Sequence, residues 1–190
     1  MKKMSVSQNE CWITLGDRAG SRLEAAPTGP LGHEYRFLNH TGEEFGRLRL
    51  RGLRGASFAA EELTAEILRQ GALRLRYRMT CAGEEILTAG PERPLGGTYR
   101  IETRRSSYRS RPGFLKREVV LWLAGDNPED TLEDVRYESV EAARIDGSLT
   151  GRGLSVRMAD PEHLPATVFA VYQLLSLQRR IHTVGSGRTI

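Results

Sequence analysis

The feature that most constrains the fold is an apolar run at residues 164–177 (LPATVFAVYQLLSL). After Pro165, its only polar side chains are those of Thr167, Gln173 and Ser176. In a helix that turns about 100° per residue, these three side chains point in different directions, so the helix has no polar face. The run is also too short to span a membrane, which takes about 20 apolar residues. We therefore expect a core helix that a sheet surrounds on all sides.

The ends of this expected helix are also recognisable. Pro165 suits the first turn, where a missing N–H leaves no hydrogen bond unmade. Gly185 is a suitable stop. No linker divides residues 1–190, so we expect a single domain. Residues 1–9 and 185–190 are expected to be flexible tails.

Much of the remaining chain alternates apolar and polar residues over short segments, which is typical of strands with one buried face. The clearest example is residues 73–81 (LRLRYRMTC). Residues 34–38 and 45–50 flank a turn-forming Asn-His-Thr-Gly stretch and are expected to form a hairpin. Further strands are expected at residues 11–15, 21–25, 85–88, 98–104, 114–123, 135–140, 141–145 and 154–158.

Short strands with frequent turns are typical of an all-β barrel or sandwich. Together with the apolar helix, they predict a mainly β (α+β) protein, an antiparallel β-barrel that encloses a hydrophobic C-terminal helix. Residues 57–70 are ambiguous. Ser57 as a cap, Leu63 and Ile67 four residues apart, and Gly71 as a stop favour one further short helix, while a strand stays open.

Cys11 and Cys81 are the two cysteines of the chain. They are too few for a disulfide framework, and no cysteine or histidine motif has the spacing of a zinc site. Cys81 ends an alternating segment on its apolar side, so we expect a buried, reduced thiol. The N-terminal lysines are not followed by an apolar run, which argues against a signal peptide. We expect a cytoplasmic protein without metal, cofactor or transmembrane segment.

Charge is unevenly distributed along the chain. Residues 45–117 carry 15 arginines and one lysine against seven glutamates, a balance of +9. Residues 118–150 carry nine acidic residues against two arginines, a balance of −7. All but three of the 28 basic residues are arginine, which either serves anion recognition or reflects genomic base composition alone. Outward positions on or beside three expected strands hold Arg47, Arg49, Arg51, Arg74, Arg76, Arg78, Arg100 and Arg104.

These eight arginines are the candidate anion-binding residues. If their three strands are neighbours, the side chains form one ladder that can bind the phosphates of a lipid or another anionic partner. The alternative is that outward positions are polar for solubility, and that acidic strands pair with basic ones across the sheet. The net charge of +4 is modest for a nucleic-acid binder, so nucleic acid is the less expected partner.

The order of three segments adds a resemblance. The hairpin FLNHTGEEFGRLRL, the late strands EAARIDGSLTGRGLSVRM and the closing helix PATVFAVYQLLSL follow one another along the chain. In this order the chain resembles the tubby C-terminal-like folds, especially the LURP-one-related group. The resemblance implies a closed β-barrel around a hydrophobic C-terminal helix. It assigns no site residue, because tubby-like proteins that bind phosphoinositides use exterior basic residues that no motif matches here.

No catalytic motif is present in the sequence, such as a P-loop, a GxSxG turn or an HExxH helix. We expect the four histidines to be solvated or to cap helices rather than to act as bases or ligands. They are His33, His40, His163 and His182.

The expected function is therefore a non-enzymatic binding module that engages anionic phospholipid or another anionic partner through an arginine-rich face. Two alternatives stay open. One is self-association between the basic and acidic regions. The other is a carrier of small apolar ligands, for which Tyr99, Trp122 and Tyr137 are candidate wall residues.

Overall fold

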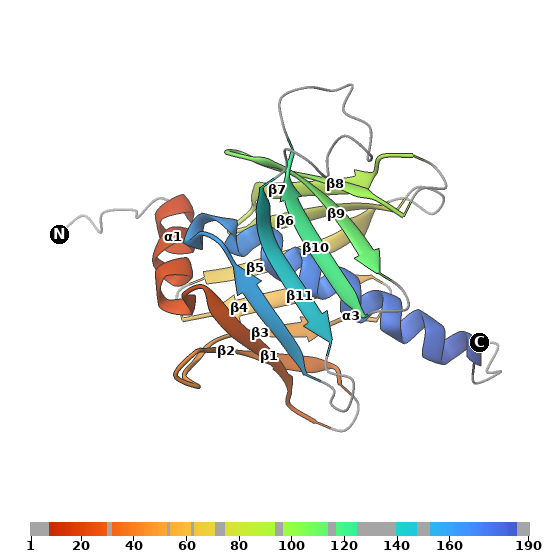
Figure 1. Cartoon of the computed structure of the whole chain (residues 1–190), viewed down its shortest axis with the longest axis horizontal. Helices are drawn as coiled ribbons and strands as arrows, with labels where there is room; N and C mark the ends of the chain where they lie inside the picture. Colours follow the sequence, from red (N-terminus) through yellow and green to blue (C-terminus); the bar gives the residue numbers. More distant parts are fainter. Residues whose placement is uncertain are drawn as a thin grey trace.

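The computed structural model describes residues 8–29, 32–52, 54–61, 63–70, 75–93, 97–113, 117–124, 140–147 and 153–185. Within these ranges, twelve antiparallel strands close into a barrel, which confirms the predicted fold class (Figure 1). The strands are β1 (Arg22–Pro27), β2 (Glu34–Asn39), β3 (Glu44–Leu50), β4 (Gly55–Ala60), β5 (Leu63–Gln70), β6 (Arg76–Cys81), β7 (Glu84–Pro91), β8 (Tyr99–Thr103), β9 (Ser107–Gly113), β10 (Glu118–Leu123), β11 (Glu141–Gly147) and β12 (Leu154–Met158). The helical elements are α1 (Gln8–Ala19), the 3₁₀ turn η1 (Pro161–His163) and α3 (Leu164–Gly185).

The barrel has the simplest antiparallel order, since each strand pairs with its neighbours in the sequence. The ring closes where β1 pairs with β12, with Leu23 opposite Val156 and Ala25 opposite Leu154. All four of these side chains are buried. Because each of the described strands has a partner on both sides, none of them presents a free edge for pairing with another chain.

The predicted core helix is confirmed. α3 passes through the barrel, and its C-terminal part extends beyond the strands (Figure 1). No side chain of residues 166–175 is more than 5% exposed. The rings of Phe169 and Tyr172 pack against Tyr77 of β6, with centroids 5.5 and 5.8 Å from it. In the described part of the chain, no helix has the length and apolar character needed to cross a bilayer.

Among the described side chains of α3, the two buried polar ones are both hydrogen-bonded. The Thr167 hydroxyl donates to the carbonyl of His163, 2.8 Å away and one turn earlier. Gln173 accepts a hydrogen bond from the Ser110 hydroxyl of β9 through its Oε1 atom, at 3.0 Å. A buried polar group without a hydrogen-bond partner destabilises the fold. These two hydrogen bonds explain why Thr167 and Gln173 can be buried in a helix that has no exposed face.

The expected strand at residues 11–15 is wrong, because this segment lies in α1. The strand was predicted because this segment contains residues that favour β-strands. In the fold, Trp12, Leu15 and Ala19 share one buried helical face. Gly16 lies against η1, where a Cβ atom would come within 2.3 Å of the Pro161 carbonyl oxygen. α1 therefore covers the end of the barrel at which α3 begins (Figure 1).

The favoured helix at residues 57–70 is also wrong, and the alternative of a strand holds. Residues in this segment form most of β4 and all of β5. Leu63, Ala65 and Ile67 are buried and alternate with more exposed residues. The spacing of Leu63 and Ile67 fits a strand as well as a helix, and pairing of β5 with both β4 and β6 decides between them.

The other expected strands overlap β1, β6, β7, β8, β10, β11 and β12, and these are the ones expected at residues 21–25, 73–81, 85–88, 98–104, 114–123, 141–145 and 154–158. The hairpin at 34–38 and 45–50 is confirmed as β2 and β3, and the Asn39 side chain accepts hydrogen bonds from the backbone of Thr41 and Glu43 in its turn. The polar segment 107–113 is not among the expected strands, yet it forms β9. Nearly all of the expected strand at 135–140, and most of both expected tails, lie outside the described residues.

We predict that Gly16→Ala destabilises the protein by about 1–3 kcal/mol, because the new methyl group overlaps Pro161. Alanine favours a helix by about 1 kcal/mol relative to glycine. A loss of stability can therefore be attributed to the overlap with Pro161 and not to helix propensity. Urea denaturation followed by tryptophan fluorescence measures it. Gly29→Ala is the matched control, since nothing lies within 4 Å of its Cβ position. Equal stability of the two variants would contradict the packing described here.

We also predict that Gln173→Met destabilises the protein by about 1–3 kcal/mol, because it leaves the buried Ser110 hydroxyl without its acceptor. Adding Ser110→Ala should recover part of this loss, since neither polar group then remains. A double-mutant cycle of urea unfolding free energies gives the coupling. Strict additivity of the two changes would show that the hydrogen bond does not couple helix and barrel.

Candidate functional site

The three arginine rows predicted from the sequence lie on strands that are not neighbours. β4 and β5 separate β3 from β6, and β7 separates β6 from β8. The rows therefore do not form one continuous ladder. Arg47 and Arg49 lie on β3, Arg51 follows it, Arg76 and Arg78 lie on β6, Arg100 lies on β8, Arg104 follows it, and Arg74 is outside the described residues.

Most of these arginines are paired with glutamates. Glu34 of β2 lies 3.5 Å from the Arg47 guanidinium and 2.9 Å from that of Arg49. Arg51 pairs with Glu66 of β5 at 3.0 Å. Exposed pairs of this kind contribute only about 0–1 kcal/mol each, but they compensate the charge of the β3 row. The other pairs are Arg78–Glu85 at 3.9 Å, Arg100–Glu102 at 3.0 Å and Arg104–Glu84 at 3.1 Å.

Two of the predicted arginines do come together, on either side of Gly90 in β7. Gly90 is the register partner of Arg100 in β8. On its other side, a Cβ atom on Gly90 would lie 3.6 Å from Cγ of Arg76 in β6. Both arginines line an open hollow of about 470 Å³ beside Gly90, which we call the Gly90 hollow. Its lining is Gln70, Arg76, Tyr77, Thr88, Ala89, Gly90, Pro91, Glu92, Arg100 and Glu102.

Among the described residues around the Gly90 hollow, one cation has no partner. Arg109 is 7% exposed and pairs with Glu92 at 2.8 Å. Arg100, which is the register partner of Arg109 in β9, pairs with Glu102. Arg76 is exposed, and its side chain makes no hydrogen bond or ion pair within the described part of the chain. The two carboxylates therefore engage two arginines, and the third faces solvent at the hollow.

Sequence reasoning missed Gly90 and Arg109 as parts of this site. An isolated glycine inside a strand often marks a place where another group approaches closely, and this signal was available at Gly90. Arg109 was missed because the polar segment around it was not expected to be a strand. Its burial follows from the register of β9 with β8 and β10, which the sequence does not show.

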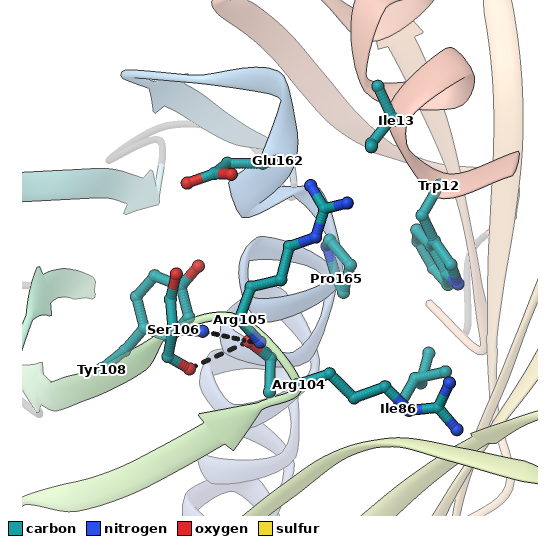
Figure 2. Close-up of a pocket in the computed structure, with 10 residues that line it drawn as sticks. Trp12, Ile13, Ile86, Arg104, Arg105, Ser106, Tyr108, Glu162 and Pro165 are labelled. Carbon is teal, nitrogen blue, oxygen red and sulfur yellow. Dashed lines mark hydrogen bonds between the residues drawn. The ribbon is translucent and has the colours of Figure 1, made fainter. Parts of the chain in front are cut away.

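A second hollow lies at the opposite end of β8, between α1, η1 and the β8–β9 turn. Figure 2 shows the Arg105 side chain rising from that turn into the space between Glu162 and Ile13. Trp12 and Pro165 form apolar parts of its wall. Its volume of about 50 Å³ has room for a few water molecules, and ligand sites of about 300 Å³ or more are typical for small molecules. We therefore do not assign a ligand to it.

The three residues proposed as walls of an apolar carrier do not gather around a cavity in the described chain. Tyr99 packs toward the barrel interior, with its ring centroid 6.3 Å from that of Tyr77. Trp122 is partly buried on β10, and Tyr137 lies outside the described residues. The space beside α3 is filled by the side chains of the helix and of the inward strand positions.

The expectation for His163 is wrong, because its side chain is buried. His163 is 4% exposed, and its Nδ1 atom lies 3.1 Å from the Tyr108 hydroxyl. Burial lowers the pKa of His163, an effect that the nearby Glu162 and Asp160 oppose. Burial likewise raises the pKa of Tyr108. The two neutral rings thus hold η1 to β9 where α3 begins.

Two of the other histidines are exposed, as expected, and the side chain of the third is outside the described residues. His40 is exposed in the β2–β3 turn. His33 is also exposed, and its Nδ1 atom lies 3.0 Å from the guanidinium of Arg179. The side chain of His182 is outside the described residues.

The fold defines a class: closed antiparallel β-barrels with a helix through the barrel. An X-ray structure of a protein from Arabidopsis thaliana is similar to this chain, with a TM-score of 0.51. The similarity covers 83% of this chain and 94% of that chain, at 7% sequence identity. At this identity it shows a shared fold and no more. No family model and no curated protein matches the sequence.

We predict that stability falls with acid through His163. The folded pKa lies below the unfolded value of 6.5, so the unfolded state binds the proton first. Stability is therefore full above pH about 6.5 and declines by up to about 1.4 kcal/mol per pH unit below it, until the lowered folded pKa is reached. Urea denaturation at a series of pH values measures this decline.

His163→Gln should weaken this acid dependence, because glutamine does not titrate. The exposed His40→Gln variant controls for the loss of a histidine and should follow the wild type. Parallel stability curves for wild type and His163→Gln would contradict the assignment of this titration to His163.

Proposed function

We propose that the protein is a non-enzymatic binding module that holds an anionic group in the Gly90 hollow, between Arg76 and Arg100. The observation that carries the proposal is the pair of arginine stems on either side of a glycine that has no side chain to fill the gap. A planar guanidinium can donate two parallel hydrogen bonds to a phosphate or carboxylate. Two such groups facing one hollow suit a ligand with several acceptor oxygens.

The neighbouring residues support this assignment. Thr88 and Gln70 line the same hollow and offer a hydroxyl and an amide as further donors. Glu92 and Glu102 engage Arg109 and Arg100, so they orient cations and also limit the positive charge. We expect binding of moderate affinity, because the net charge of the hollow is small, and we expect it to weaken with salt, because the hollow is open to solvent.

The partner we favour is an anionic phospholipid headgroup presented by a membrane surface. Basic residues near such a surface contribute about 1 kcal/mol each. The other arginines of the original set add to the positive field of the barrel but are mostly paired. We further propose that the chain is related to the LURP-one and tubby-like barrels and works in the cytoplasm. The order of its elements and its two free cysteines support this.

The proposal predicts binding to vesicles of phosphatidylcholine with phosphatidic acid, and no binding to phosphatidylcholine alone. Replacing Arg76 and Arg100 together by glutamine should weaken vesicle binding by about tenfold or more, since each charge contributes about 1 kcal/mol. Flotation or sedimentation with vesicles at increasing salt measures both effects.

The matched control is the double variant Arg22→Gln and Arg36→Gln. These two arginines are exposed on β1 and β2. In the closed strand order, β1 and β2 are about half the ring away from β6, β7 and β8. The control removes the same charge and should change binding by less than about twofold if the site is local. If both double variants lost vesicle binding equally, the binding would come from general charge attraction and not from a local site. If the wild type did not bind the vesicles, the proposal would be wrong.

A further inference from the structure

The two ends of the barrel differ, and one of them is marked by the exit of α3. Successive strands run in opposite directions, so the odd-numbered strands end where α3 leaves the barrel and the even-numbered strands begin there (Figure 1). Two hydrogen bonds from different strand connections show this. Arg179 of α3 donates to the Gly32 carbonyl between β1 and β2, at 2.6 Å. Arg117, just before β10, donates to Oε1 of Gln178, at 3.5 Å. We call this end of the barrel the exit end.

Four arginines at the exit end have side chains that make no ion pair or hydrogen bond with any other described residue. They come from three successive strand connections. Arg54 precedes β4, Arg69 and Arg76 flank the β5–β6 connection, and Arg93 follows β7. Arg54, Arg76 and Arg93 are exposed. The backbone N–H of Arg69 donates to the carbonyl of Arg54 at 3.1 Å, so the first two connections touch.

The glutamates on this side of the barrel are engaged by other arginines. Glu66 of β5 pairs with Arg51 at 3.0 Å, and Glu92 pairs with the buried Arg109 at 2.8 Å. Glu24 is exposed near Gly153 at the exit end, but its strand β1 is at least three strands away from β4 to β7 in the ring. The four arginines therefore leave a local excess of positive charge among the described residues of the exit end.

The opposite end of the barrel is acidic. Glu43 and Glu61 lie in its turns, and both pair with Arg18 of α1. Asp160 and Glu162 lie in the segment that leads into α3. The β8–β9 turn adds two arginines, one of which pairs with a glutamate of β7. In the described part of this end, carboxylates outnumber arginines. A barrel with one basic and one acidic end turns its basic end toward an anionic surface.

We infer that the exit end is the surface that docks on an anionic membrane, with Arg54, Arg76 and Arg93 toward the lipid headgroups. The inference rests on the proposed function, because the Gly90 hollow lies at the same end. Arg76 begins β6 and Pro91 ends β7, and both residues line the hollow. One headgroup is held in the hollow, and the neighbouring arginines bind the phosphates of the lipids around it.

The emergence of α3 at this end is consistent with a membrane as the partner. The helix continues beyond the strands toward the side that would face the bilayer (Figure 1). Leu177, where the helix leaves the barrel, and Leu75, just before β6, are partly exposed. A lipid interface accepts apolar groups beside cations, and binding to it draws on both.

The first test maps the docked end on the full chain. Amide hydrogen exchange, read by mass spectrometry, is compared with and without vesicles of phosphatidylcholine and phosphatidic acid. Exchange should slow severalfold in peptides that cover residues 51–54 and 92–93, and should stay unchanged in the β2–β3 turn and in α1. Vesicles of phosphatidylcholine alone should change neither. If the bound protein is protected at the opposite end, or along the barrel wall alone, the inference is wrong while the proposed binding to anionic lipid stands.

The second test removes charge from the exit end without touching the hollow. Arg54 and Arg93 do not line the hollow. Replacing both by glutamine should weaken vesicle binding by about tenfold or more. The double variant Arg22→Gln and Arg36→Gln again removes the same charge elsewhere, and we expect it to change vesicle binding by less than about twofold. Binding of soluble glycerol 3-phosphate, followed by NMR titration, should be the same in the exit-end variant as in the wild type.

The outcomes separate this inference from the proposed function. If the exit-end variant bound vesicles like the wild type, while replacing Arg76 and Arg100 weakened binding, the docking surface would be wrong and the hollow would stand. If the exit-end variant also lost glycerol 3-phosphate, its arginines would belong to the hollow, and the separate docking surface would again be wrong. If the wild type bound no vesicles, both would be wrong.

Discussion

The structure depends on the burial of a helix that is apolar on all sides. A sheet can cover one side of such a helix, but α3 has no side that tolerates water along residues 166–175. A closed barrel meets this requirement, because its strands surround the helix and every inward position can be apolar. The two buried polar side chains of α3 are tolerated because Ser110 and the His163 carbonyl pair with them. Helix and barrel are therefore mutually dependent, and neither buries its apolar surface without the other.

Filling the interior with a helix moves the remaining chemistry to the outer surface and to the ends of the barrel. On the outer surface, arginines and glutamates on nearby strands compensate one another, as Glu34 does for Arg47 and Arg49. A hollow appears where this regular pattern is interrupted by Gly90, whose neighbours on both sides are arginines. In the proposed function, this interruption provides the local site, on a surface where many of the other charges are paired.

The end of the barrel at the start of α3 has a different character. There α1, η1 and the β8–β9 turn meet through close contacts, such as that of Gly16 with Pro161 and that of His163 with Tyr108. The contacts are close, and one of the groups involved is a titratable imidazole, that of His163. This end therefore responds to acid through His163, while the Gly90 hollow is shaped by strand register.

The sequence by itself determined the central helix, the β-barrel class and most of the strands, because the apolar run and the alternation of side chains are local patterns. It misassigned α1 and residues 57–70, where β-forming or helix-forming residues have a spacing that fits both structures. It could name Arg76 and Arg100, but not that they face each other across Gly90 or that Arg109 is buried beside them. Only the tertiary structure decided those points, because strand register and barrel closure depend on pairing between segments that are distant in the chain.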